Sequence, residues 1–142
     1  MQMYQGKEIL GIKDDIQSPF DLHKLTVRGL PRKAITQLEK SLCLKDGEIA
    51  PLLHISPRMI TRYKKEKSRK NLNSDITERI LRIAEVVARC REVFEDKELS
   101  NTWLKTKNMV LGYVEPLKLL NSYYGIDVVL EELVRIEHGI IA

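Results

Sequence analysis

The fold is decided between residues 46 and 65, which run Asp46-Gly47-Glu48-Ile49-Ala50-Pro51-Leu52-Leu53-His54-Ile55-Ser56-Pro57-Arg58-Met59-Ile60-Thr61-Arg62-Tyr63-Lys64-Lys65. The first half predicts a short helix that Pro51 shortens or bends. Ser56 followed by Pro57 predicts the start of a second helix, because serine caps helix N-termini and proline fits the first helical position. Two short helices joined by so few residues are typical of a helix-turn-helix, whose second helix can lie in the DNA major groove.

The packing of such a motif makes three demands on the sequence. Ala50 supplies the small residue where the second helix crosses the first. Apolar residues face back from the second helix at Ile55, Ile60 and Tyr63. The turn position that is usually glycine is His54, so the sequence leaves the geometry of the turn open.

Charge separates the chain into two parts, although the net charge is only +4. Between Arg58 and Lys70, seven Lys and Arg residues face the single acid Glu66, whereas from Tyr113 to Ala142 five acids outnumber two bases. The basic segment suits a polyanion, and we expect its first residues to reach base edges and the later lysines to contact phosphates. A solvated basic face is the alternative interpretation. The predicted DNA-binding residues are Ser56, Arg58, Thr61, Arg62, Lys64, Lys65, Lys67, Arg69 and Lys70.

The rest of the chain predicts helices only, because capping residues and apolar positions recur at helical spacing and no strand alternation occurs. Roughly eight helices are expected, with starts near Ser18, Pro31, Asp46, Ser56, Asn73, Asp96, Pro116 and Ser122. Residues 1–17 show no clear period. We expect an all-α fold with one continuous core, divided into residues 1–72 (an arm, dimerisation helices and the helix-turn-helix) and residues 73–142 (a long helix and the C-terminal region).

Several side chains are expected in that core. Cys43 and Cys90 lie within helical patterns, where cysteine behaves as a small apolar residue. The C-terminal region should bury Trp103, Tyr113, Leu117 and Leu120 to hold the last helix in place.

Composition argues against several classes of protein. A chain of 142 residues can bury a core, and no apolar run is long enough to cross a membrane. The N-terminus resembles no signal peptide, so a cytoplasmic location is expected. No Cys and His occur at metal-ligand spacing, and no catalytic set or Gly-rich phosphate loop is present, so we predict no enzyme activity, no metal and no cofactor.

A family resemblance joins these features. The segments that carry it are Gly29-Leu30-Pro31, Leu53 to Arg58, Arg79 to Ala84, Trp103-Leu104, Asn108 to Gly112, Glu115-Pro116-Leu117 and Arg135 to Gly139. In this order they resemble the Xre-type antitoxins that pair with RES toxins, across the chain after residue 18. The resemblance implies a type II antitoxin whose C-terminal region binds a RES-type toxin that consumes NAD or transfers ADP-ribose. It also implies binding to its own operator, and we expect a homodimer that forms through the helices between Ser18 and Cys43.

The resemblance further implies that the end of the chain covers the active cleft of the toxin. The predicted toxin-binding residues are Glu137, His138, Gly139, Ile140, Ile141 and Ala142. Two alternatives concern this region: Ile140 and Ile141 can fold back as a hydrophobic C-cap, or the C-terminal helices can serve only to dimerise a stand-alone repressor. A scaffold that binds protein and no nucleic acid is a third.

Overall fold

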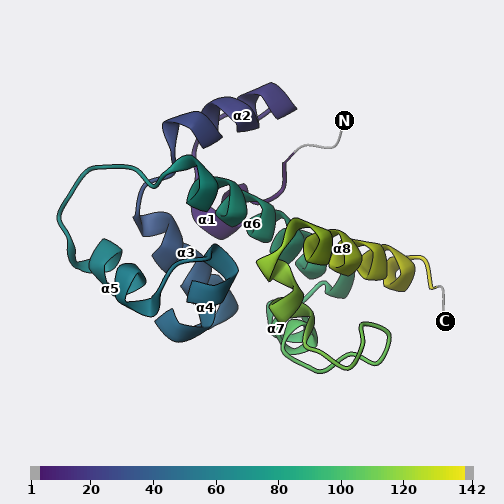
Figure 1. Ribbon diagram of the computed structural model, residues 1–142. Helices are drawn as coiled ribbons and strands as arrows, with labels where there is room; N and C mark the ends of the chain where they lie inside the picture. Colours follow the sequence, from purple (N-terminus) through teal and green to yellow (C-terminus); the bar gives the residue numbers. More distant parts are fainter. Residues whose placement is uncertain (1–3, 140–142) are drawn as a thin grey trace.

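The computed structural model describes residues 4–139 and is helical throughout (Figure 1). Its helices are α1 (Lys7–Leu10), α2 (Pro19–Arg28), α3 (Lys33–Leu42), α4 (Asp46–Leu53), α5 (Pro57–Lys65), α6 (Ser74–Phe94), α7 (Lys97–Leu104), the 3-10 helix η1 (Pro116–Asn121) and α8 (Tyr123–Glu137). Extended pairing within the described residues is limited to one isolated bridge between Asn108 and Val114. The predicted all-α class is therefore confirmed. No helix in residues 4–139 is both long and apolar enough to cross a membrane.

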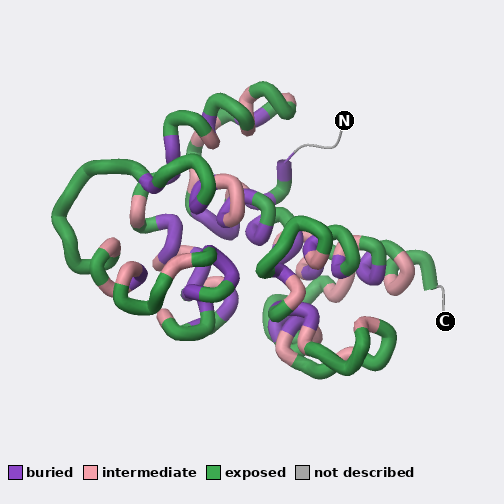
Figure 2. The backbone as a smooth tube through the Cα atoms, in the orientation of Figure 1, coloured by how far each residue is buried: buried purple, intermediate pink, exposed green. Residues whose placement is uncertain are grey.

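Helix α6 is the element around which the others pack. It begins where the Asn73 side chain accepts a hydrogen bond from the Ile76 amide at 2.9 Å, and it ends at Glu95, which adopts a left-handed conformation. It contacts α1, α2, α3 and α4 of the N-terminal half and α7 and α8 of the C-terminal half. Buried residues lie in α6 and in the helices that pack on it (Figure 2). They form one cluster, so the two halves of the chain share one core, as predicted.

Serine side chains start three of the helices at the predicted positions. Ser18, Ser56 and Ser122 accept hydrogen bonds from the backbone N–H groups that begin α2, α5 and α8. These local signals were sufficient to place the helix starts, because the capping interaction lies within four residues of sequence.

The N-terminal segment forms an arm that packs on α6. Tyr4 is buried and donates a hydrogen bond from its hydroxyl to the Leu81 carbonyl at 2.5 Å, and Ile9, Leu10 and Ile16 join the core. A four-residue helix has too short an apolar pattern for periodicity to predict it, so its existence could not be seen in the sequence.

Two residues that were expected in the core lie at the surface. Cys43 ends α3 in a left-handed conformation with φ 53° and is exposed, whereas Cys90 is buried, and its burial raises the pKa of the thiol to about 11. Tyr113 is 65% exposed in the loop after α7. Both errors arise where the chain turns with positive φ, so the helical period no longer predicts which way a side chain points.

The other predicted core residues of the C-terminal region were placed correctly. Leu117 and Leu120 are buried, and the half-buried Trp103 packs against Phe94 with ring centroids 5.6 Å apart. The Trp103–Phe94 contact holds α7 against the end of α6, and η1 packs on α4, α7 and α8.

Gly29 allows the chain to pass close to the connector between α5 and α6. Its φ of 89° and ψ of 148° fall in a region that essentially only glycine adopts. A Cβ atom there would lie 2.2 Å from the Leu72 carbonyl oxygen, while the Leu72 amide donates to the Leu30 carbonyl at 2.8 Å. The end of the connector that leads into α6 is thus attached to the residues just before α3.

We predict that Gly29→Ala destabilises the protein by about 3 kcal/mol, because both the backbone strain and the clash with Leu72 are unavoidable. Urea unfolding measures the loss. Gly47→Ala is the matched control, since a Cβ at Gly47 meets no atom within 4 Å, and it should leave stability nearly unchanged. Equal unfolding midpoints for the two variants would contradict the account of this close approach.

Candidate functional site

The turn between α4 and α5 keeps its tight geometry despite the histidine. His54 adopts φ 58° and ψ 37°, and its backbone N–H donates to the Ala50 carbonyl. Histidine is among the non-glycine residues that enter this left-handed region more often than most. The His54 Nε2 lies 2.5 Å from the Asn121 carbonyl oxygen, so the side chain also connects the turn to the start of α8.

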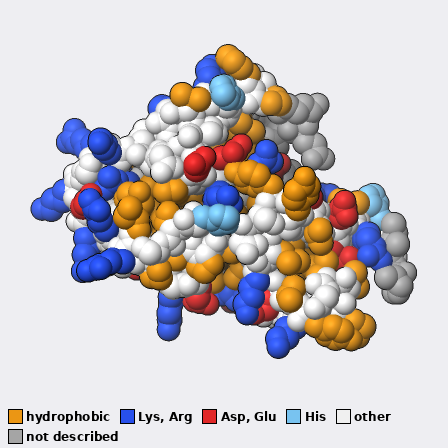
Figure 3. All heavy atoms as spheres, in the orientation of Figure 1, with side chains coloured by type: hydrophobic (Ala, Val, Ile, Leu, Met, Phe, Trp, Pro, Cys, Tyr) orange, Lys and Arg blue, Asp and Glu red, His pale blue; other side chains and the backbone are white. Residues whose placement is uncertain are grey.

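The inner face of α5 packs as the sequence predicted. Ala50 and Ile60 are fully buried, and Ile55 and Tyr63 are partly buried against the core. The outer face borders a hollow of about 640 Å³ that is lined by Ser56, Arg58, Met59, Thr61, Arg62 and Lys65. Lys and Arg side chains gather at the end of the molecule formed by α5 and the connector that follows it (Figure 3).

Two predicted DNA-binding residues, Thr61 and Lys64, contact acidic side chains of α3 and α4. The Lys64 ammonium lies 2.8 Å from Asp46 Oδ1 and 3.1 Å from Glu39 Oε1, and the Thr61 hydroxyl donates to Asp46 Oδ2 at 3.0 Å. The Lys64 side chain is only 35% exposed and that of Glu39 only 7%. These contacts fix α5 against α3 and α4. A phosphate contact from Lys64 stays a prediction, and in the free protein its charge serves the helix packing.

The charges in this cluster shift one another's protonation. Burial raises the pKa of Glu39, and a hydrogen bond with Asp46 adds to the effect. Hydrogen bonds from Glu39 and Lys64 lower the pKa of Asp46 to about 2. The two carboxylates raise the pKa of Lys64, so the lysine stays charged.

The connector carries three further basic residues at its surface. Lys67, Arg69 and Lys70 are exposed, while Arg32 holds the connector by donating from Nε to the Lys70 carbonyl at 3.1 Å. The structure therefore brings the connector and α5 together at one end of the molecule, which the sequence could suggest only through their proximity along the chain.

At the other end, α8 is held by apolar and ionic contacts. Ile126, Val129 and Leu133 are buried, and the Glu137 carboxylate pairs with Arg89 Nη2 of α6 at 2.7 Å. His138 is exposed and Gly139 has a φ of 67°. The remaining predicted toxin-binding residues, Ile140, Ile141 and Ala142, lie outside the described residues.

Exposed apolar side chains are concentrated in this C-terminal region. Of the large hydrophobic side chains that are exposed in the described residues, all but Phe20 and Val27 lie after α6: Leu99, Met109, Val110, Tyr113, Val114, Tyr123, Tyr124, Val128 and Val134. The loop that presents four of them is ordered by Asn108, whose backbone N–H donates to the Val114 carbonyl at 3.0 Å and whose Oδ1 accepts from the Val110 amide. Such concentration marks a surface that binds another macromolecule.

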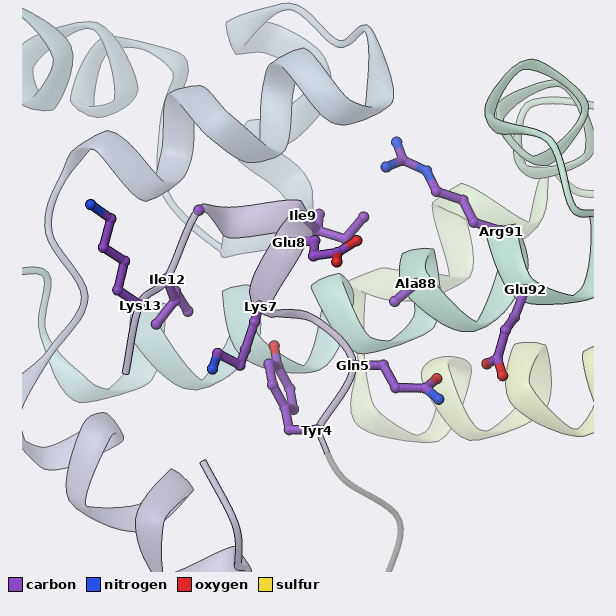
Figure 4. A pocket seen from close by; sticks show the side chains of 11 residues that line it. Tyr4, Gln5, Lys7, Glu8, Ile9, Ile12, Lys13, Ala88, Arg91 and Glu92 are labelled. Atoms are coloured by element: carbon purple, nitrogen blue, oxygen red, sulfur yellow. The ribbon is translucent and has the colours of Figure 1, made fainter. Parts of the chain in front are cut away.

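A hollow of about 770 Å³ lies between the N-terminal segment and α6 (Figure 4). Lys7, Glu8, Arg91 and Glu92 line it with both signs of charge, and their side chains do not converge on one point. Within residues 4–139, no three His, Cys, Asp or Glu side chains are grouped as a metal site would group them. The basic end and the apolar end are therefore the candidate sites.

Comparison with known proteins matches both ends. Residues 21–85 match the model of the antitoxin Xre-like helix-turn-helix domain, and residues 89–139 match that of the antitoxin Xre/MbcA/ParS C-terminal toxin-binding domain. The chain is 28% identical over 122 residues to Antitoxin Xre of Photorhabdus laumondii, spanning 85% of this chain and 81% of that protein.

A solved structure supports the same fold. A chain of the M. tuberculosis MbcT-MbcA toxin-antitoxin complex superposes with a TM-score of 0.57 at 20% identity, covering 78% of this chain and 96% of that one. At this identity the match concerns the fold.

The fold and sites thus define a helix-turn-helix protein with a C-terminal protein-binding domain. The chain belongs to the Xre/MbcA/ParS family of antitoxins, as the sequence resemblance indicated. Membership in this family points to a regulatory rather than a catalytic protein. The two matched domains meet inside α6, and the boundary at residues 72 and 73 stays a prediction.

We predict that Lys64→Met destabilises the protein by about 2 kcal/mol at neutral pH, because it leaves the buried Glu39 carboxylate without its cation. The raised pKa of Glu39 sets the sign of the pH dependence: its protonation at lower pH relieves the unpaired charge, so the deficit should be smaller at pH 4 than at pH 7. Chemical unfolding at both pH values measures it. Lys65→Met, at an exposed neighbouring position, should change stability little. If the loss of stability of Lys64→Met relative to the wild type grows towards acid pH, the unpaired Glu39 carboxylate is not its cause.

Proposed function

We propose that this antitoxin has two activities: neutralisation of a partner toxin by its C-terminal domain, and repression of its own operon by the helix-turn-helix. The observation that carries the proposal is the separation of the two surfaces. Basic side chains lie on α5 and the connector, whereas exposed apolar side chains lie on α7, the loop after it and α8. A polyanion and a protein partner can therefore be bound at different ends of one core.

We propose that the toxin is of the RES type, as the family resemblance implies, and that it consumes NAD or transfers ADP-ribose. A cleft that binds the phosphates of a dinucleotide is expected to be basic, and the acidic residues of α8 complement such a cleft. The exposed apolar residues of the C-terminal domain supply buried contact area. Residues Glu137 to Ala142 are proposed to enter the cleft, since Gly139 with positive φ lets the chain leave the helix axis.

Deleting Gly139 to Ala142 should abolish protection of cells that express the adjacent toxin, because the residues proposed to fill the cleft are removed. Circular dichroism should show an unchanged fold, since the buried residues of α8 end at Leu133. Growth after co-expression and co-purification with the toxin measure the effect. Full protection by the shortened protein would reject insertion of the tail, and Val128→Glu would then test whether the exposed face of α8 inhibits by itself.

We propose that the operator is bound by α5 in the major groove. Arg58 and Arg62 are placed to contact base edges, and Lys65, Lys67, Arg69 and Lys70 to contact phosphates. Two-fold related half-sites require a dimer, and the exposed Phe20 and Val27 on α2 offer apolar surface for self-contact within the region expected to form it.

Replacing Arg58 and Arg62 together by alanine should weaken binding to the DNA upstream of the gene by about 30-fold or more, because two arginine–base contacts of 1–3 kcal/mol each amount to at least about 2 kcal/mol. Electrophoretic mobility shifts at physiological salt measure this. Lys107→Ala with Lys118→Ala removes the same charge from exposed positions in the C-terminal region, away from α5 and α2, and should leave binding nearly intact. If both double variants bind equally, α5 is not the recognition helix. A protein that represses without any adjacent toxin would instead be a stand-alone repressor.

A further inference from the structure

Glu66 joins two arginines from different helices. Its Oε1 accepts a hydrogen bond from Arg62 Nε at 2.8 Å, and its Oε2 accepts one from Arg32 Nη1 at 2.8 Å. Glu66 is also the single acid among the seven bases between Arg58 and Lys70. A negative charge at this place weakens attraction to phosphates. If Glu66 contributes to DNA binding, it does so by fixing the positions of the Arg32 and Arg62 side chains.

Arg32 is the fixed end of this chain of contacts. Its side chain is only 15% exposed, its guanidinium carbon lies 4.9 Å from the centre of the Tyr63 ring, and its Nε donates to the Lys70 carbonyl. Three separate contacts leave the Arg32 side chain little freedom. Glu66 is thus attached to the body of the protein through α3 as well as through its own backbone.

Arg62 is the free end. Its side chain is 66% exposed and borders the hollow on the outer face of α5 beside Arg58. Because Glu66 occupies the Nε–H, the terminal Nη1 and Nη2 groups remain available, and they make no hydrogen bond to any described residue. A terminal fork of this kind matches the O6 and N7 acceptors that guanine presents in the major groove.

We propose that Glu66 is a positioning residue for DNA recognition: it holds Arg62 so that the terminal fork of the guanidinium recognises a guanine. The inference rests on the proposed DNA-binding function and adds a base preference and its cause. A long arginine side chain loses less conformational freedom on binding when it is already held, and a held fork discriminates better between base edges.

The test uses the full-length protein and a pool of double-stranded DNA with a randomised centre. Selection and sequencing identify the motif preferred by the wild type, and binding is then measured on that motif and on copies with single base-pair changes. We expect a guanine whose replacement weakens wild-type binding at least 10-fold, which lies within the roughly 5- to 150-fold expected for one bidentate contact. Arg62→Ala should lose this preference.

Glu66→Gln is the decisive variant, because the amide NH2 that replaces one carboxylate oxygen is a donor and cannot accept the hydrogen bond of the arginine on that side, so the two arginines can no longer be held by separate oxygens. It should bind the unselected pool as tightly as the wild type or more tightly, yet discriminate at the guanine less than about 3-fold. Glu48→Gln is the matched control: it removes one charge from an exposed position on α4, and glutamine can still accept the hydrogen bond from the Lys45 amide. It should keep the full preference.

Thermal unfolding midpoints of the two glutamine variants should agree within a few degrees, so that lost discrimination is not a consequence of lost stability. If Glu66→Gln selects the same guanine with unchanged discrimination, or if Arg62→Ala keeps it, the inference is wrong while DNA binding stands. If the wild type enriches no motif and its binding does not weaken with salt, the DNA-binding function itself fails, and the inference with it.

Discussion

The structure depends on the burial of α6 by helices from both halves of the chain. Its buried residues are Ile76, Thr77, Ile80, Leu81, Ile83, Ala84, Val86, Val87 and Cys90, which is more than one face of a helix. Burying each large aliphatic side chain stabilises by about 2 kcal/mol, so this helix contributes strongly to the core. Helices α1 to α4 pack on α6, and so do α7 and α8 of the C-terminal region.

Polar contacts add a second connection between the two ends. His54 in the turn and Arg79 of α6 both reach the Asn121 carbonyl, where η1 gives way to α8. Tyr123 then donates to Glu78 at 2.8 Å, and the guanidinium groups of Arg79 and Arg82 lie about 5 Å from its ring. A histidine in the turn thus replaces glycine at a conformational cost, and it gains a contact that glycine cannot make. The turn before α5 and the start of α8 are thus held together.

The sequence predicted the fold well because its signals are local. Serine caps and the apolar period of α6 act within one or two helical turns, so the helix starts were placed correctly. Failures occurred where the decisive contact is distant or the chain turns. An N-terminal arm was expected, but its attachment was not: Tyr4 donates a hydrogen bond to the Leu81 carbonyl, 77 residues away, and no local pattern predicts that contact. Cys43 ends α3 with a positive φ, and Tyr113 has a positive φ in the loop after α7, so no helical period predicts the direction of either side chain.

In the candidate DNA interface, too, contacts between distant parts of the chain decide what the local sequence cannot. Lys64 and Lys65 are identical neighbours in a basic run, and sequence assigned both to phosphates. Along a helix, consecutive side chains differ by about 100° in direction. That rotation turns Lys64 towards Glu39 and Asp46 and leaves Lys65 on the outer face. The acids that engage Lys64 lie on α3 and α4, so charge counting along the chain cannot distinguish a lysine that binds a ligand from one that holds the helix. The run of basic residues identifies the basic segment of the chain. The direction of each side chain around the helix axis decides which of its lysines face solvent and can bind a ligand.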